Sequence, residues 1–572
     1  MEQKGLDLNF FIGMFLILGI IMWINVSQVQ NNLDTSTKQN EKIENKLTVE
    51  SSQINKIEEK KPDARKTLPS VIYNLSNEFL SIDFSNYGAS ISQVELKDFK
   101  TYNNKPLIIA KDLIFDFSFF IKDEIINCSE LFFSDVDKQK NKISFTYIDN
   151  YDNSVVFVYE LKPNSYSLDF NVLTKNGNTY IEPNKLTVIQ NIQQQEKNLK
   201  NERNNTTINY SVNSSSSKQL SLMKDATKSI ENPSWVAHKQ QFFSTIINSN
   251  NFRQVSINTS TPEHNNYVKR LTSQFDIEFD NNKSSYFFNI MFIPNKYSLL
   301  STFDSGYESL VPLGKFVFGW VNKYLVIPMF NFLEKMNLNY GIIILIIAFV
   351  IKLLLFIPTR SSYISMAKMR VLKPEIDAIN EKISDPLQKQ QAQMNLYRKT
   401  GVNPLGGCLP LLFQMPILIA LFRFFPASIE LRQQPFLWAD DLSTYDSILD
   451  FGFSIPLYGD HISLFALLMT GATLLQMIYS NQLSGSSQMP QMKYVMYTMP
   501  VVFLFVMNNY SAALSYYYFL ANLITFAQQA IIRRGIDDEK LYALLQANKK
   551  KPVKKSKFQQ KLEEIAKQNK KK

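Results

Sequence analysis

A single lysine stands inside a long apolar stretch of the chain. Lys352 lies within IIILIIAFVIKLLLFIPT, which runs from Ile342 to Thr359. An ammonium group at such a depth in lipid costs about 2.5–3.5 kcal/mol, and contact with water reduces that cost. The alternative, in which the side chain extends to the lipid headgroups, requires it to cover about 12 Å, roughly twice its length. We therefore expect Lys352 to face a water-filled cavity and to meet a negative charge carried by a ligand.

Polar side chains recur at steps of three and four in the other apolar stretches, so each set shares one helical face. Each set, taken alone, is explained as well by hydrogen bonds between helices or to the helix backbone. Their convergence near one lysine favours a hydrated groove instead. The candidate groove residues selected on these grounds are Lys352, Gln414, Thr470, Thr473, Gln476, Tyr518, Asn522, Thr525 and Gln529.

The sequence offers little for catalysis or for a cofactor. Cys128 and Cys408 form no CxxC and no metal spacing, so we expect neither a disulfide nor a metal site. HExxH and GxxxxGK[ST] are both absent, and no nucleophile–base set is visible. The chain is therefore predicted to be no enzyme, and to work without a cofactor or ATP.

The elements that must position these residues are apolar stretches of a length that suits a membrane. A bilayer core of about 30 Å needs roughly 20 helical residues. Six spans are predicted, at Leu8–Asn25, Tyr340–Pro358, Leu405–Phe425, Ile462–Tyr479, Tyr494–Met507 and Leu514–Ile532.

The loops between the spans predict their orientation. The loop from Arg360 to Pro404 is rich in lysine and arginine, whereas the loop from Pro426 to Asp460 carries Arg432 alone. Because basic loops stay in the cytoplasm, the first loop is expected inside and the second outside. Both termini then lie in the cytoplasm.

Between the first two spans the pattern changes to alternation. Leu80, Ile82 and Phe84 alternate with polar residues, as do many later segments that turn residues separate. This pattern is typical of a sandwich of antiparallel sheets. One helix is expected within it, over Trp235–Ile247.

The predicted fold is a polytopic α-helical membrane protein with six transmembrane helices and a large all-β periplasmic sandwich domain. Its predicted parts are an N-terminal anchor (1–25), a flexible linker (26–68), the β-sandwich domain (69–300), an interfacial amphipathic helix (301–338), a five-span core (339–533) that includes a cytoplasmic helical hairpin (360–404), and a basic cytoplasmic tail (534–572).

Two cytoplasmic features suggest contacts with partners. Apolar residues that step by three and four from Met369 to Ile383 predict a helix seam, which Ser384–Asp385–Pro386 ends. From Arg533 to Lys572 there are 14 basic and 5 acidic residues, so most of the net charge of +10 lies there. The tail is expected to be either a solvated segment or a contact for anionic lipid or RNA.

Three motifs resemble one known family. Their sequences, in chain order, are SYISMAKMRVLKPEI, VNPLGGCLPLLFQMPILIALF and LSYYYFLANLITFAQQ. Together they are similar to the core of the YidC-type membrane protein insertases of Gram-negative bacteria. NPSWVAHKQQFF resembles a stretch of that family's periplasmic domain. The resemblance implies a bacterial inner-membrane protein that moves nascent membrane proteins into the bilayer through a groove open to cytoplasm and lipid.

The resemblance also implies roles for particular residues and partners. Lys352 matches the charged groove position, where the family usually has arginine, and Tyr517 and Tyr518 match a tyrosine pair near the substrate path. The implied partners are nascent membrane proteins, membrane lipids, the ribosome or signal-recognition components at the hairpin and tail, and a Sec translocon. Two other functions stay open from the residues alone, a small-solute transporter with a periplasmic sensing domain and a structural anchor for the β domain.

Overall fold

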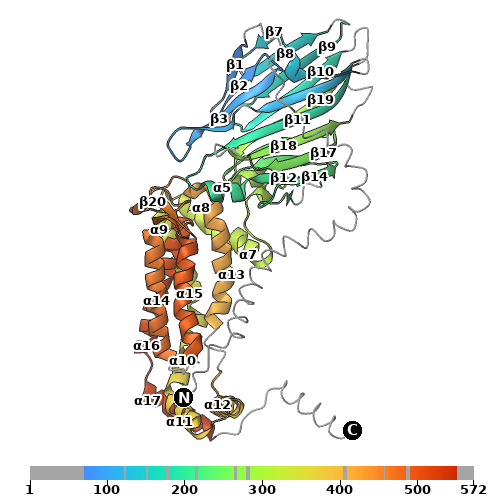
Figure 1. Ribbon diagram of the computed structural model, residues 1–572. Coiled ribbons are helices and arrows are strands. Elements are labelled where there is room, and N and C mark those ends of the chain that lie inside the picture. Colours follow the sequence, from blue (N-terminus) through green and yellow to red (C-terminus); the bar gives the residue numbers. More distant parts are fainter. Residues whose placement is uncertain are drawn as a thin grey trace, which may run out of the picture. The chain divides into compact units, whose positions relative to one another are not determined.

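The computed structural model describes residues 70–111, 113–121, 124–149, 152–175, 181–212, 217–262, 267–278, 284–403, 409–456, 458–484 and 490–550 (Figure 1). The predicted anchor (1–25), the predicted linker (26–68), Cys408 and residues 551–572 of the predicted tail lie outside these ranges. The chain divides into one unit of residues 1–70 and 489–493 and a second of residues 71–488 and 494–572. The elements below belong to the second unit, apart from residues 490–493 at the start of α15.

The strands of the β-rich region form three antiparallel sheets in the described residues. One sheet has the order β1 (Ile72–Ser76), β2 (Leu80–Ser85), β3 (Ser90–Lys100), β4 (Pro106–Lys111). The second has the order β13 (Lys218–Gln219), β12 (Thr207–Ser211), β15 (Trp235–Lys239), β16 (Phe243–Asn248), β19 (Ser285–Pro294), β10 (Ser167–Lys175), β9 (Ser154–Leu161), β8 (Lys142–Ile148), β7 (Asp135–Lys138). The third has the order β14 (Ala226–Glu231), β17 (Phe252–Ser260), β18 (Tyr267–Ile277), β11 (Ile181–Gln193), β5 (Ile114–Ile121), β6 (Glu124–Asn127).

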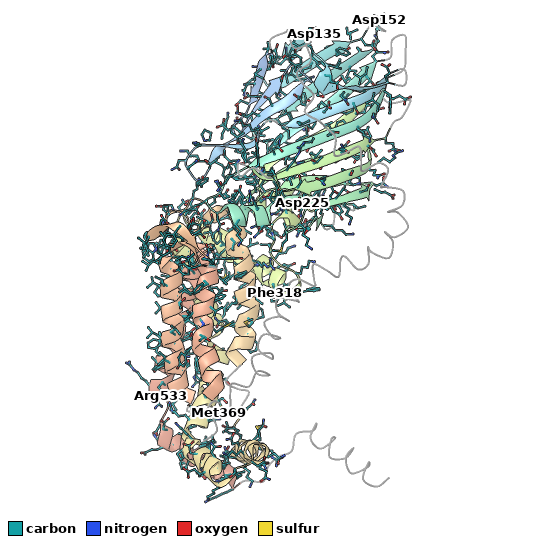
Figure 2. The ribbon with its side chains drawn as sticks, viewed as in Figure 1. Asp135, Asp152, Asp225, Phe318, Met369 and Arg533 are labelled. Carbon is teal, nitrogen blue, oxygen red and sulfur yellow. The ribbon has the colours of Figure 1, made fainter. Side chains whose placement is uncertain are left out.

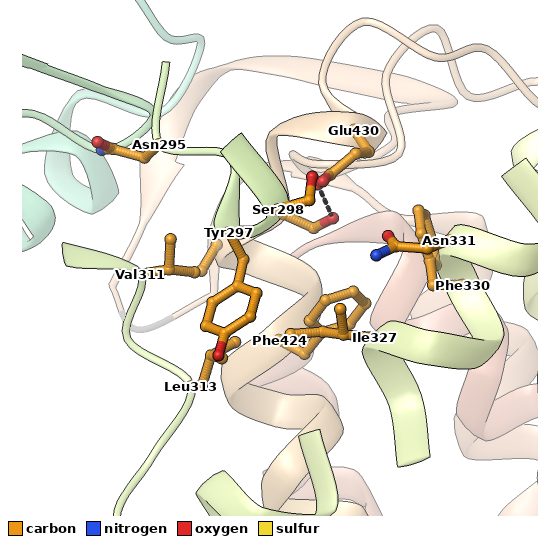
Figure 3. Close-up of a pocket in the computed structure, with 12 residues that line it drawn as sticks. Asn295, Tyr297, Ser298, Val311, Leu313, Ile327, Phe330, Asn331, Phe424 and Glu430 are labelled. Carbon is orange, nitrogen blue, oxygen red and sulfur yellow. Dashed lines mark hydrogen bonds between the residues drawn. The ribbon is translucent and has the colours of Figure 1, made fainter. Parts of the chain in front are cut away.

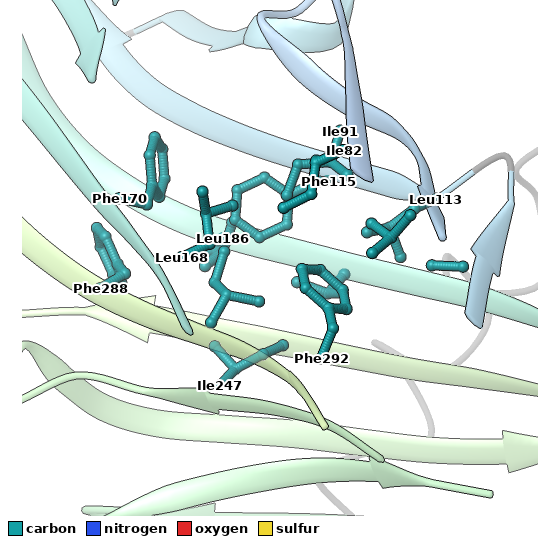
Figure 4. Packing of buried hydrophobic residues seen from close by; sticks show 14 of the residues in the cluster. Ile82, Ile91, Leu113, Phe115, Leu168, Phe170, Leu186, Ile247, Phe288 and Phe292 are labelled. Atoms are coloured by element: carbon teal, nitrogen blue, oxygen red, sulfur yellow. The ribbon is translucent and has the colours of Figure 1, made fainter. Parts of the chain in front are cut away.

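Alternation along the strands builds the core of this region. In β2, Leu80, Ile82 and Phe84 are buried while the residues between them are half-buried. Side chains from all three sheets meet in one apolar cluster, where Ile82 of β2, Phe170 of β10 and Leu186 of β11 contribute (Figure 4). Side chains of period two that point to a shared interior hold sheets face to face. The predicted β-rich region is therefore confirmed.

The prediction of a helix at Trp235–Ile247 is wrong, because this segment forms strands β15 and β16. Every residue of β15 is buried. Val236 packs into the core between the sheets, whereas Trp235 and Ala237 on the opposite face pack against the helical region. A strand covered on both faces loses its alternation, so its sequence reads like that of a buried helix.

The rest of the described chain is mainly helical. After α5 (Leu199–Asn205) in the β-rich region, the helices are α6 (Tyr297–Leu300), α7 (Phe316–Val321), α8 (Ile327–Glu334), α9 (Tyr340–Leu354), α10 (Phe356–Val371), α11 (Lys373–Lys382), α12 (Pro386–Thr400), α13 (Leu409–Phe424), α14 (Leu464–Ser484), α15 (Pro490–Met507), α16 (Ala512–Arg534) and α17 (Asp538–Lys549). The described chain also contains a hairpin of β20 (Leu449–Ile455) and β21 (Gly459–Ile462). Its short helical turns are η1 (Cys128–Glu130), η2 (Ser301–Phe303), η3 (Tyr307–Leu310), η4 (Asn322–Val326), η6 (Phe425–Ala427) and η7 (Ile429–Leu431).

Six membrane spans are not confirmed by helix length and hydropathy. In the described residues one continuous helix passes both criteria, Phe316–Glu334, which consists of α7, η4 and α8. The pair α9 and α10 passes when taken together, but it bends by 59° at Leu355. Pro358 lacks the N–H that would bond the carbonyl of Leu354, which explains a break at this point. Shorter apolar helices lie at Phe413–Ala427, Leu464–Ser480 and Tyr497–Met507.

The helix Phe316–Glu334 is joined to α13 by a buried amide. Asn322, which is fully buried, donates from Nδ2 to the carbonyl of Ala420 at 2.8 Å and to that of Leu313 at 2.8 Å. It stands in η4, a turn of π-helix. Single π-helical turns often mark positions where a helix adapts to a specific contact.

A small separate core lies at the end of α10. Its buried residues are Leu545 of α17 together with Leu372, Ile376, Leu396 and Val402. Gln393 of α12 donates to Asn380 of α11 at 2.9 Å. The two helices expected between Arg360 and Pro404 are thus present as α11 and α12. The segment expected as a basic tail contributes a third helix, α17, to this core.

Candidate functional site

Lys352 lies near the C-terminal end of α9 and is only 4% exposed. Its Nζ donates to Oε1 of Gln414 on α13 at 3.0 Å. In the described part of the chain, no carboxylate forms an ion pair with it. A neutral amide satisfies one donor of the ammonium group but does not neutralise its charge.

The last long helix, α16, packs beside both α9 and α14. Gln528 donates from Nε2 to the backbone carbonyl of Lys352 at 3.0 Å. Gln529 donates to the hydroxyl of Tyr363 on α10 at 2.7 Å and to that of Ser480 on α14 at 2.8 Å. Through these two glutamines α16 is hydrogen-bonded to α9, which carries Lys352, and to α10 and α14.

The two predicted polar faces of α14 and α16 meet at one contact. Asn522 donates from Nδ2 to Oγ1 of Thr473 at 2.7 Å. The hydroxyls of Thr470, Thr473 and Thr525 donate to carbonyls of their own helices four residues earlier, at 2.7–2.9 Å. Backbone bonding, the alternative raised by the sequence, thus accounts for Thr470 and Thr525. Gln476 is half-buried on α14.

Tyr517 and Tyr518 lie buried on the N-terminal half of α16. The hydroxyl of Tyr518 donates to the carbonyl of Leu418 on α13 at 3.1 Å. The two tyrosine rings meet edge to face with centroids 5.6 Å apart, and Phe425 lies 5.9 Å from Tyr517. Tyr518 therefore holds α16 against α13, and Tyr517 holds it against the turn η6 that follows α13.

The structure brings the predicted residues together in separate contacts on a common set of helices. Lys352 meets Gln414, Thr473 meets Asn522, and Gln529 meets two residues that the sequence did not indicate, Tyr363 and Ser480. Ser480 stands four residues beyond Gln476, so an extension of the α14 face would have found it. Tyr363 follows the bend at Leu355, and no periodicity in the sequence marks it.

A second polar site lies away from these residues, in a small cavity between α8, the end of α13 and the segment that leaves the β-rich region (Figure 3). Glu430 points into it and accepts a hydrogen bond from the Ser428 hydroxyl at 2.7 Å. Burial raises the pKa of the Glu430 carboxyl, although the Ser428 hydrogen bond opposes the shift. The cavity is otherwise lined mainly by apolar side chains such as Phe330 and Phe424, and it contains none of the predicted groove residues.

No cluster of three or more metal-ligating side chains occurs among the described residues. The chemistry of the predicted groove residues is that of amides, hydroxyls and one ammonium group. This arrangement can bind a polar or acidic segment by hydrogen bonds and charge.

Two protein-family descriptions match almost the whole described chain. Residues 73–328 match "YidC periplasmic domain", and residues 332–539 match "60Kd inner membrane protein". The boundary between the two matches falls within α8.

Curated relatives carry one shared name. The chain is 40% identical over 518 residues to "Membrane protein insertase YidC" of Parabacteroides distasonis. This alignment covers 86% of this chain and 82% of that protein. It is 39% identical over 497 residues to the protein of that name from Amoebophilus asiaticus, with 83% of each chain covered.

Solved structures show weaker likeness. One match is a crystal structure titled as an active YidC insertase with its first transmembrane domain resolved. The alignment covers 81% of this chain and 93% of that chain, at 17% sequence identity and a TM-score of 0.34. A galactose mutarotase-like protein from Lactobacillus casei covers 39% of this chain and 100% of its own, at 11% identity and a TM-score of 0.29.

Proposed function

Because this chain belongs to the YidC family of membrane protein insertases, we propose that Lys352 and the polar faces around it form the groove through which nascent proteins enter the bilayer. Membership of this family supports a membrane location, and the inner membrane is the proposed one, with nascent membrane proteins as the proposed substrates. The transporter alternative is not supported, since the relatives that match most of the chain are insertases.

The observation that supports this groove best is the state of Lys352, a buried cation whose hydrogen-bond partner is the neutral Gln414. An opposite charge at about 4 Å gains roughly 4 kcal/mol at an effective dielectric constant of 20. The acidic outer segment of a substrate would supply that charge. The remaining driving force is the transfer of the apolar substrate segment into lipid, about 25 cal/mol per Å².

The proposed orientation follows from the charges of the loops. The α11–α12 hairpin and α17 lie in the cytoplasm, both termini lie there too, and the β-rich domain lies in the periplasm. In this orientation the hairpin and the basic tail are placed to meet the ribosome or signal-recognition components, and the inner-membrane part is placed to meet a Sec translocon and lipid.

Site-specific crosslinking tests the groove. Photoreactive residues at Lys352, Gln414 and Tyr518 are expected to capture a nascent membrane protein stalled on the ribosome. A probe at Tyr102, which is exposed in the β-rich region, is the matched negative position. Equal capture at all four positions, or capture at Tyr102 alone, would show that the substrate does not pass this groove.

A further inference from the structure

A carboxylate of α17 is bound by two arginines. Asp538, the first residue of α17, accepts hydrogen bonds from Nη1 and Nη2 of Arg533 at 3.0 Å each, one to each carboxylate oxygen. Nη2 of Arg370 on α10 donates to the same carboxylate at 2.6 Å. Two parallel N–H···O bonds from one guanidinium, with a second guanidinium added, form a strong and geometrically specific carboxylate site.

The electrostatics of Asp538 agree with this geometry. Partial burial raises the pKa of its carboxyl, but the hydrogen bond from Arg533 and the charge of Arg370 outweigh burial, so the pKa lies below its usual value. Asp538 therefore stays charged at neutral pH.

The two arginines also line a small pocket between α10 and α16. Tyr363 and Gln529 line the same pocket, and these residues belong to the hydrogen-bond network of the proposed groove. Gln529 is buried, and its Oε1 has no hydrogen-bond partner within the described ranges. This oxygen is an acceptor that a peptide N–H can use. The labels of Met369 and Arg533 lie where the long helices meet α11, α12 and α17, next to the pocket (Figure 2).

The helix that carries Asp538 is held by one buried leucine and by hydrogen bonds to α11. Leu545 packs into the small core beside Leu372 and Ile376. Glu375 of α11 accepts from Lys549 at 2.8 Å and also from Gln546. Ion pairs that are partly exposed contribute about 0–1 kcal/mol each. These ion pairs therefore add little to the docking of α17, which leaves the buried Leu545 as its main support.

We infer that Arg370 and Arg533 form a binding site for a carboxylate of an acidic polypeptide segment that approaches the groove, and that Asp538 fills this site until α17 is displaced. The inference rests on the proposed function. It extends that function by adding a first contact for the substrate before Lys352. The fork geometry favours a peptide carboxylate, because the group that already fits the site is a carboxylate on a polypeptide.

The test uses the full chain in nanodiscs and a fluorescent peptide with four aspartates, compared with the same peptide carrying asparagines. An internal ligand competes at an effective concentration in the millimolar range. Asp538→Asn is therefore expected to raise affinity for the acidic peptide about tenfold, with no change for the neutral peptide. Glu539→Gln is the matched control, because it removes one negative charge at the next position, where the side chain is exposed.

A second variant separates the site from simple loosening of α17. Asp538→Asn combined with Arg370→Gln and Arg533→Gln is expected to lose the gain, while hydrogen exchange shows α17 as loose as in the single variant. Equal affinity of the wild-type chain and Asp538→Asn for the acidic peptide would overturn the inference. A gain that persists without the arginines would overturn it as well.

RNA and anionic vesicles, measured as additional probes with the same chains, test two other ligands for the arginines. If Asp538→Asn raises binding of RNA or of anionic vesicles but not of the peptide, the arginines bind phosphate and the inference is wrong. Failure of the proposed function is distinguishable, because groove crosslinking of nascent chains would then be absent in the wild-type chain also.

Discussion

Among the residues that the structure describes, no carboxylate forms an ion pair with Lys352, which lies where the substrate is expected to pass. Its type and its apolar surroundings are plain in the sequence, and its burial agrees with them. Its partner, Gln414, had been selected as a groove residue, yet nothing in the sequence showed that the two side chains touch. The same holds for Thr473 and Asn522, whose contact joins two faces that were predicted separately.

The first prediction concerns the sign of this charge. Lys352→Glu is expected to reduce insertion of a substrate with an acidic outer tail by about tenfold or more, since the carboxylate repels that tail. Lys352→Arg is expected to retain insertion. Protease protection of the translocated tail measures the effect. A substrate with a neutral tail is the control, and equal insertion by all three chains would contradict the role of the charge.

At the scale of elements, local sequence pattern predicts some helices and strands, whereas others depend on tertiary contacts. Period-two alternation predicted strands such as β2, and heptad spacing predicted helices in the hairpin. The strands β15 and β16 were missed, because burial on two faces removes alternation. The helix α17 was missed because lysine-rich sequence around it predicts a solvated tail, while one buried leucine attaches it to α11 and α12.

Neighbouring leucines of α17 provide the second prediction. Leu545 is 1% exposed and Leu544 is 52% exposed. Leu545→Ala is expected to weaken docking of α17 by about 2–3 kcal/mol, the usual cost of emptying a core leucine site. Hydrogen exchange over residues 538–549 measures this as faster exchange. Leu544→Ala, the control, is expected to change exchange little, and similar effects of both variants would show that the helix is not docked through this face.

At the scale of the whole molecule, a buried polar junction links the β-rich region to the helical region. Arg432 donates from Nε to Glu196 at 2.8 Å and from Nη2 to the carbonyl of Lys100 at 2.6 Å. Burial raises the pKa of Glu196 to about 7, although the charge of Arg432 opposes the shift. Burial and the nearby Glu196 raise the pKa of Glu202 well above its usual value. The segment that follows α13 is thereby tied to the β-rich region.

The third prediction is a pH dependence of stability at this junction. A carboxyl whose pKa is raised by folding stabilises the fold fully below its unfolded pKa of about 4.3, and this contribution is lost as pH rises through the folded pKa. The full chain in nanodiscs is therefore expected to unfold at a lower temperature at pH 8 than at pH 5.5, with a difference on the order of 2 kcal/mol from these groups. Thermal unfolding across this pH range measures it.

Glu202→Gln isolates the cause. It removes one raised carboxyl and the like charge beside Glu196, so the slope of stability against pH is expected to become shallower. Glu124→Gln, at an exposed position of β6, is the matched control and is expected to keep the wild-type slope. An unchanged slope in Glu202→Gln would assign the pH dependence to other groups.

The sequence by itself determined the β-rich and helical regions, the lysine in its apolar stretch and the family, because periodicity, apolar length and motifs are properties of consecutive residues. Tertiary structure decided the pairs, namely Lys352 with Gln414, Arg370 with Asp538 and Glu196 with Arg432, which stand 62, 168 and 236 positions apart. Such contacts depend on how helices and sheets pack, and packing is set by the fit of whole surfaces. For that reason the cation was visible in the chain, while the amide beside it and the carboxylate in the arginine pair were visible only in the fold.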